Sequence, residues 1–209
     1  MYVGHSLPAV TEPSELSRRE RRKLEVRQRI LDAAMQLFDS QGFPHTTVAD
    51  ICERADVAHK TFFNHFPSKQ DLFRELAGLG LESVLLHIET ARKEGRTTRE
   101  RLERFFSVVA ENATHRELLT DMVHAVHESA DKSEHARKFH DAFGAIIQDG
   151  LSAGDVTRRH AAETLTEMIL GAYYVLMFSF ANLDDFPIRE RALAAASFLA
   201  DALAPLPEE

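Results

Sequence analysis

The sequence predicts an all-α protein of about nine helices, and three observations support this. Strand signals are nearly absent, because no segment sustains an alternation of apolar and polar residues. Apolar residues instead recur with the period of an amphipathic helix. Several short motifs also place a capping oxygen three residues before an acid, as at helix N-termini. These motifs are Ser17–Glu20, Thr47–Asp50, Ser68–Asp71, Thr97–Glu100, Thr114–Glu117 and Asp131–Glu134.

The expected helices follow one another along the chain. Residues 1–16 hold two prolines and show no periodicity, so we expect a flexible tail there. The first helix should run from about 18 to 40, with Val26, Ile30 and Leu37 on one face, and should end at Gly42. Further helices are expected at about 48–55, 59–65, 68–94, 98–113, 115–129, 133–152, 159–181 and 187–204.

Composition places the chain among ordinary globular proteins. Of its 209 residues, 44% are hydrophobic and 28% are charged. No uninterrupted apolar run reaches the roughly 18 residues of a membrane span, and residues 1–10 show no secretory signal. Cys52 is the single cysteine, which excludes an intrachain disulfide and fits a reducing compartment. We therefore expect a cytoplasmic protein without a membrane partner.

The net charge of −8 is unevenly distributed along the chain. Residues 1–80 hold 11 basic and 11 acidic residues, so the whole excess of negative charge lies in residues 81–209. Seven cations crowd into residues 18–29. This asymmetry fits a chain whose first part meets phosphates, although a charged run is often only a solvated helix face.

Residues 46–69 have the pattern of two short helices joined by a tight turn. Val48, Ile51 and Ala55, together with Cys52, should form the buried side of the first helix, and Val57 should fill the turn. Phe62 and Phe66 should anchor the second helix to the same core. The residues left outward, namely His59, Lys60, Thr61, Phe63, Asn64 and His65, suit a helix that enters a DNA major groove.

This segment resembles the DNA-binding domain of TetR-family repressors, and the resemblance runs from about Arg29 to Phe73. It rests on ILDAA at 30–34, Leu37-Phe38, Gly42-Phe43, TTVADI at 46–51, TFFNHF at 61–66 and SKQDL at 68–72. The resemblance implies a helix-turn-helix domain over 17–73, followed by a variable ligand-binding and dimerisation domain over 74–205. The later residues resemble the family only in the number and length of their helices.

The resemblance also implies which residues touch DNA. They are Thr47, Ala58, His59, Lys60, Thr61, Phe63, His65 and Lys69. Lys60 and Thr61 are expected to read bases, whereas Thr47, His65 and Lys69 are expected to hold phosphates. The sequence departs from the family in having Phe63 for a more usual tyrosine, Ala58 for a frequent serine and Asp56 for a turn glycine. Aspartate tolerates the left-handed backbone better than most residues.

The last two expected helices should form the dimer interface of such a repressor. The first of them is apolar nearly all round, so it needs a partner on every side, although a plain core helix would show the same pattern. In the family, these two helices build a four-helix bundle across the dimer axis. The interface residues expected on this basis are Met168, Ala172, Leu176, Ala195, Ala196 and Leu199.

The resemblance to this family also implies a small organic effector bound in the second domain. The residues expected to wall its pocket are Phe105, Val109, Met122, His127, Phe139, Phe143 and Tyr173. Aromatic stripes at helical spacing are also what an ordinary core requires, so a plain core remains an alternative for these positions.

Function is expected to be that of a homodimeric repressor, released from a near-palindromic operator by its effector. The alternative is a metal-responsive regulator or an all-α metal-binding protein that uses the cluster His115, His124, His127, His135 and His140. A third interpretation is a helix-turn-helix used for protein contact. We find no nucleophile–base pair and no phosphate loop, so neither an enzyme nor a cofactor is expected.

Overall fold

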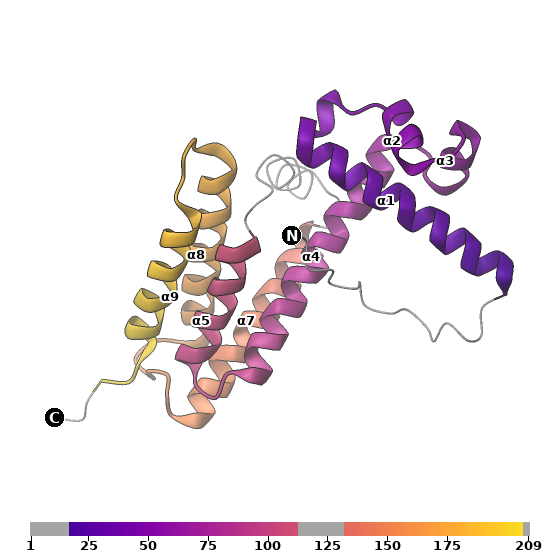
Figure 1. The fold of residues 1–209 in the computed structure, drawn as a ribbon. Helices are drawn as coiled ribbons and strands as arrows, with labels where there is room; N and C mark the ends of the chain where they lie inside the picture. Colours follow the sequence, from indigo (N-terminus) through magenta and orange to yellow (C-terminus); the bar gives the residue numbers. More distant parts are fainter. Residues whose placement is uncertain (1–16, 113–131, 207–209) are drawn as a thin grey trace.

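The computed structural model describes residues 17–112 and 132–206, and this part of the chain is entirely helical (Figure 1). The expectation of an all-α fold is confirmed. The expected helix at 115–129 lies outside the described residues. The described helices are α1 (Arg18–His45), α2 (Val48–Ala55), α3 (His59–His65), α4 (Lys69–Glu94), α5 (Thr98–Asn112), α7 (Lys132–Ala153), α8 (Ala162–Asn182) and α9 (Ile188–Leu203).

Helix starts follow the capping motifs. In four of the expected pairs, the backbone N–H of the acid donates to the hydroxyl oxygen three residues before it, at 3.1–3.3 Å. These pairs are Ser17–Glu20, Thr47–Asp50, Ser68–Asp71 and Thr97–Glu100. The pairs Thr114–Glu117 and Asp131–Glu134 include residues outside the described part of the chain.

A first hydrophobic core joins α1, α2, α3 and the start of α4. Gly42, at φ 78°, breaks the regular course of α1, as expected for a residue that ends a helix. The chain beyond Gly42 then turns back so that Phe43 packs against Phe38 and Phe73. The fully buried centre of this core is made of Ile30, Ala34, Phe38, Ile51, Phe62 and Leu72.

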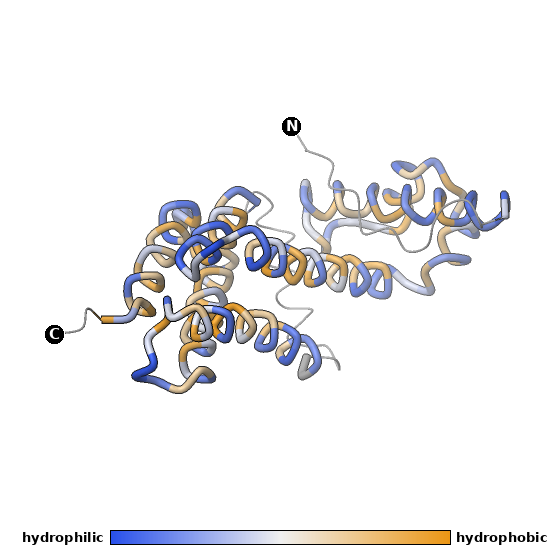
Figure 2. The backbone as a smooth tube through the Cα atoms, turned by 90° about the horizontal axis from the view of Figure 1, so that it is seen from below, coloured by the Kyte–Doolittle hydropathy of each residue, from blue (hydrophilic) through white to orange (hydrophobic). Residues whose placement is uncertain are grey.

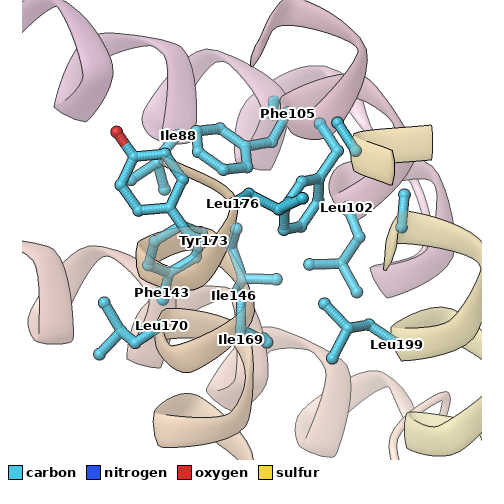
Figure 3. Close-up of a cluster of buried hydrophobic side chains, with 14 of the residues drawn as sticks. Ile88, Leu102, Phe105, Phe143, Ile146, Ile169, Leu170, Tyr173, Leu176 and Leu199 are labelled. Atoms are coloured by element: carbon cyan, nitrogen blue, oxygen red, sulfur yellow. The ribbon is translucent and has the colours of Figure 1, made fainter. Parts of the chain in front are cut away.

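A second core fills the space between the end of α4 and helices α5, α7, α8 and α9 (Figure 3). Aromatic rings form its centre: Phe105 lies 5.1 Å from Phe143 and 5.6 Å from Tyr173, measured between ring centroids. Leu176 and Leu199 point into the same cluster (Figure 3). These residues build the larger of the two cores.

Helix α4 belongs to both cores. Leu72 and Phe73 near its start pack in the first core, while Ile88 and Ala91 near its end pack in the second. Between them, residues 78–87 include no fully buried side chain. The domain boundary that we expect at residues 73–74 therefore falls inside a continuous helix, and the first core extends beyond it to Leu76.

Polar contacts join the helix ends of the second domain. Arg92 on α4 makes a two-pronged ion pair with Asp149 on α7, at 2.7 and 3.0 Å. The backbone N–H and hydroxyl of Thr98 donate to the carboxylate of Asp155, at 2.7 and 2.9 Å. Gly150 lies directly under this second contact. These bonds fix α5 against the C-terminal end of α7.

Helix α8 is the most apolar helix described. Its length and composition are sufficient for a membrane span, with a mean hydropathy of 1.4 over 18 residues, but 44% of that window is buried inside the protein. One side of α8 thus belongs to the second core, and its other side is apolar and exposed.

Candidate nucleic-acid interface

The turn between α2 and α3 has the geometry of a helix-turn-helix. Asp56 ends α2 in the left-handed conformation, at φ 51° and ψ 55°, which the sequence suggested by placing an aspartate there. The N–H of Val57 donates to the carbonyl of Cys52 at 3.0 Å. Arg29 on α1 donates to the carbonyls of Ala55 (3.1 Å) and Asp56 (2.6 Å), and so closes the end of α2.

The inner side of this unit is apolar, as expected from the sequence. Ile51 and Phe62 are fully buried, and Phe66 is nearly so. Cys52 is also buried, and burial raises the pKa of its thiol. The thiol therefore stays neutral and serves as a small apolar side chain, because it is the thiolate that reacts.

The outer side of α3 presents several chemistries on less than two helical turns. His59, Lys60 and Asn64 are exposed, and the ring of Phe63 is 52% exposed although large and apolar. Lys60 makes no ion pair within the described part of the chain. Ala58 precedes the helix and gives it no side-chain cap. The start of α3 therefore offers short side chains and a free cation.

Thr47 caps α2, as its capping pair with Asp50 in the sequence suggested. Its hydroxyl accepts from the N–H of Asp50, and its own N–H donates to the Asp50 carboxylate at 2.8 Å. Hydrogen bonds to the carboxylate from the backbone N–H of Thr47, and then from its side-chain hydroxyl, lower the pKa of Asp50, so the carboxylate stays ionised. The backbone amide and the hydroxyl of Thr47 are thus both used in the helix cap.

Lys69 bonds inward, although we expected it at a phosphate. Its ammonium donates to the carbonyls of Phe43 and Thr46, each at 2.7 Å, and lies 4.1 Å from the centre of the Phe43 ring. In this position it donates hydrogen bonds to carbonyls at the end of α1 that have no partner within the helix. Lys69 therefore fixes the loop that leads into α2.

His65 ends α3 in a partly buried position next to cations. Its Nδ1 is buried and has no hydrogen-bond partner in the described part of the chain. Burial, and then the positive charges of Arg27 and Lys23, hold the pKa of His65 below its usual value of 6.5. The imidazole is consequently neutral at neutral pH, and its role toward a partner is that of a hydrogen-bonding group rather than a cation.

Arg27 is a functional residue that our sequence reasoning missed. Its guanidinium donates to the carbonyl of His65 at 3.1 Å, forms an ion pair with Glu75 on α4, and lies 4.4 Å from the centre of the Phe66 ring. It thereby fixes the end of α3 against two other helices. A signal was available, because Arg27 lies three and seven residues before Ile30 and Ala34, on a face that turns inward.

The structure divides the expected dimer residues into two groups. Leu176, Ala196 and Leu199 are buried in the second core of a single chain, so these three do not remain available for a partner. Met168 is exposed, and Ala172 and Ala195 are partly buried. The strongly exposed apolar side chains nearby are others: Val175 at 63%, Phe178 at 62% and Phe198 at 71%. Periodicity missed Val175 and Phe178 because α8 is apolar on every side, and it gave no signal for Phe198 on α9.

The expected effector residues lie together where they are described. Phe105, Phe139, Phe143 and Tyr173 form one cluster, in which the Phe139 and Tyr173 rings stack at 5.9 Å. Val109 packs against it. Burial raises the pKa of Tyr173, so its phenol stays protonated. The remaining two expected residues, Met122 and His127, lie outside the described residues.

Of the histidine cluster, the structure describes His135 and His140, both on α7. His115, His124 and His127 lie outside the described residues. Within residues 17–112 and 132–206, no group of three His, Cys, Asp or Glu side chains is placed to hold a metal ion.

Comparison with known proteins identifies the family of the chain. The profile of "Bacterial regulatory proteins, tetR family" matches residues 30–76. The HTH-type transcriptional repressor KstR of Mycolicibacterium smegmatis is 30% identical over 171 residues, which cover 78% of this chain and 80% of that repressor. The chain belongs to the tetR family. KstR of Mycobacterium tuberculosis is 33% identical over 130 residues, or 60% of this chain and 56% of the relative.

Solved structures agree with the fold of this TetR-family regulator. A tetR-family regulatory protein from Rhodococcus RHA1 has a TM-score of 0.65 at 20% identity and covers 87% of this chain and 98% of its own. FadR of Bacillus subtilis, solved in complex with stearoyl-CoA, has a TM-score of 0.63 at 17% identity, with 84% and 98% covered. FadR of Thermus thermophilus, in complex with lauroyl-CoA, has a TM-score of 0.60 at 24% identity, with 88% and 96% covered.

Family membership establishes the general function. The protein is a DNA-binding transcription regulator with a helix-turn-helix, and it is not an enzyme. The short helix α3, with its exposed cation, amide and ring, lies within the residues that the family profile matches.

Proposed function

We propose that this regulator is a homodimeric repressor in which α3 of each protomer reads one half of a near-palindromic operator. The observation that carries the proposal is the outer face of α3, which exposes Lys60, Asn64 and Phe63 while Phe62 and Phe66 anchor the helix from behind. A helix held in this way can enter a major groove without losing its core.

Base reading is assigned to the first turns of α3. The unpaired ammonium of Lys60 suits the O6 and N7 acceptors of guanine, and the Phe63 ring suits the methyl group of thymine. Thr61 is partly exposed and its hydroxyl can serve either kind of edge. Phosphate contacts are left to Thr47 and His65, because Lys69 is bonded inward.

Dimerisation is assigned to the exposed apolar side of α8 and α9. Met168, Val175 and Phe178 follow one side of α8, and Phe198 extends that surface onto α9. Large exposed apolar side chains gathered on two neighbouring helices are typical of a protein interface. Pairing through it would set two α3 helices at about one turn of DNA, roughly 34–36 Å.

The effector is assigned to the second domain, as an organic molecule with a long apolar part. Two considerations support this: the aromatic cluster around Tyr173 and the acyl-CoA complexes of the two FadR proteins. An effector releases DNA only if it binds one dimer geometry better than the other. Lauroyl-CoA and stearoyl-CoA are therefore the first compounds to test.

The experiment is selection of duplexes from a random-sequence pool, followed by binding of the enriched duplex. We expect a near-palindrome to enrich, and we expect Lys60→Ala to weaken its binding by about 1–3 kcal/mol. The control is Lys93→Ala, which removes an exposed cation near the far end of α4. Release of the duplex by either acyl-CoA would support the effector class. Intact dimers that enrich no sequence would contradict the proposal.

A further inference from the structure

The first two turns of α1 extend beyond the core of the DNA-binding domain. Every residue from 18 to 25 is exposed, and the first fully buried side chain of α1 is Ile30. In Figure 1 the indigo end of α1 projects past α3, and in Figure 2 the same end is coloured as hydrophilic. We call residues 18–25 the basic extension, after Arg18, Arg19, Arg21, Arg22 and Lys23.

These five cations outnumber the carboxylates of their own segment, and the described part of the chain gives them no ion-pair partner. None of them forms an ion pair within the described part of the chain, whereas Arg27, Arg92 and Arg101 are all paired. The carboxylate of Glu20 accepts from the N–H and hydroxyl of Ser17 at 2.9 and 2.7 Å, and together with Glu25 it leaves five cations against two carboxylates in residues 18–25. An excess of like charge on a helix costs free energy unless an anion meets it.

Packing does not explain why these turns are helical. A helix that is polar all round needs local pairs or a partner to be stable. Here the helix is started by the capping box of Ser17 and Glu20, while the neighbours Arg18 and Arg22, four residues apart, repel each other. Arg19 and Lys23 have the same spacing and the same effect. The basic extension is thus an arrangement that a bound polyanion would stabilise.

Two of the cations face the same way as the recognition helix. Arg19 and Lys23 lie eleven and seven residues before Ile30, so they continue its inward face beyond the core. One turn after Lys23, Arg27 bonds the carbonyl of His65 at the end of α3. Lys23 is near enough to His65 for its charge to act on that imidazole. Arg19 and Lys23 therefore form a line that leads away from the end of α3.

We propose that the basic extension is a second DNA contact, in which Arg19 and Lys23 bind phosphates beside the half-site that α3 reads. The inference rests on the proposed function, since α3 must occupy the major groove for this line to follow the flanking backbone. Arginine and lysine contacts to phosphate add affinity that carries no sequence information. The basic extension thus sets how strongly the regulator holds any duplex.

The test compares the salt dependence of binding for two double variants. Arg19→Gln with Lys23→Gln removes the proposed contacts at exposed positions, where folding is not at risk. Lys93→Gln with Arg96→Gln is the matched control: it changes the charge equally, at exposed sites. Lys93 lies about 36 Å along α4 from Lys69, and Arg96 follows just after the end of that helix, so both sites lie beyond the screening length of about 8–10 Å. The ligands are the duplex enriched by selection and a mixed-sequence duplex of equal length.

The expected result is a smaller salt slope in the first variant alone. Each lost phosphate contact lowers the slope of log K against log salt by about 0.9, so one contact from each residue in both protomers lowers it by about 3.6. Affinities for the two duplexes should fall by similar factors, so that the preference for the enriched duplex is kept. In Lys60→Ala, by contrast, this preference should decrease.

Two results would overturn the inference while leaving the proposed function intact. One is an enriched duplex bound by the Arg19/Lys23 variant with the slope of the unaltered protein. The other is an equal fall of the slope in the Lys93/Arg96 variant, because net charge alone would then explain the effect. If the unaltered protein enriches no duplex, the proposed function itself fails.

Discussion

At the scale of single residues, cations of similar appearance in the sequence have different uses. Arg29 and Lys69 donate to carbonyls at helix ends, and Arg27 joins three helices. Lys60 has no such partner and points outward. The difference depends on whether a helix C-terminus with unpaired carbonyls lies within reach of the side chain. Such carbonyls carry partial negative charge and so bind a cation favourably. The number of basic residues in the sequence does not show which of them have such a partner.

Gly150 offers a test of packing at this scale. A Cβ at Gly150 would lie 2.2 Å from Oγ1 of Thr98 and 2.4 Å from Cγ2 of Val156, so Gly150→Ala must displace the Thr98–Asp155 contact. We expect the free energy of unfolding to fall by about 1–3 kcal/mol, measured by urea titration. Gly78→Ala meets no atom within 4 Å and should instead add up to about 1 kcal/mol. Equal effects of both changes would refute this account of Gly150.

At the scale of helices, α1 does more than complete the first core. Through Arg27 it touches the end of α3 and the first half of α4, so the recognition helix and the connecting helix share one guanidinium. The guanidinium also packs over the face of the Phe66 ring. The position of α3 therefore depends on α4 by way of a third helix.

Arg27→Met should separate these helices without leaving a void. The change removes a donor from the His65 carbonyl and the partner of Glu75, so we expect a loss of about 1–3 kcal/mol in the free energy of unfolding. Binding of the enriched duplex should weaken as well, because the end of α3 is no longer held. Arg74→Met is the control, since its ion pair with Asp71 is exposed and contributes about 0–1 kcal/mol. An unchanged affinity in Arg27→Met would show that α3 is held by packing alone.

The helices themselves were largely predictable, and their partners were not. Capping pairs and periodicity place the starts of α1, α2 and α4 within one residue of where they lie, because both signals are local. The inward bonds of Lys69 were not predictable, because its carbonyl partners come from a segment 23–26 residues earlier in the chain. Leu176 was assigned to the interface because a helix apolar all round does not reveal which side its own core takes.

At the scale of the whole molecule, two cores share α4, and an apolar surface lies at the end far from the DNA-binding domain. Val175, Phe178 and Phe198 are each more than 60% exposed, which is unusual for such side chains in a chain that works alone. A second copy of the chain that covers this surface would bring two recognition helices onto one duplex.

Phe198→Glu tests the assignment of this surface. A charge at the centre of an apolar interface must be desolvated without a partner, so we expect the dimer to dissociate into folded monomers. Sedimentation equilibrium measures this, and helical circular dichroism confirms that each monomer stays folded. Leu86→Glu is the control, at an exposed leucine on α4. A Phe198→Glu protein that remains dimeric would place the interface elsewhere.

The exposed apolar surface has a consequence for dosage. If only paired chains hold both halves of an operator, dimer concentration falls with the square of chain concentration once the chains are dilute. Halving expression would then lower the number of competent repressors about fourfold, by mass action. Repression would respond to gene copy number more steeply than in simple proportion, even with no effector present.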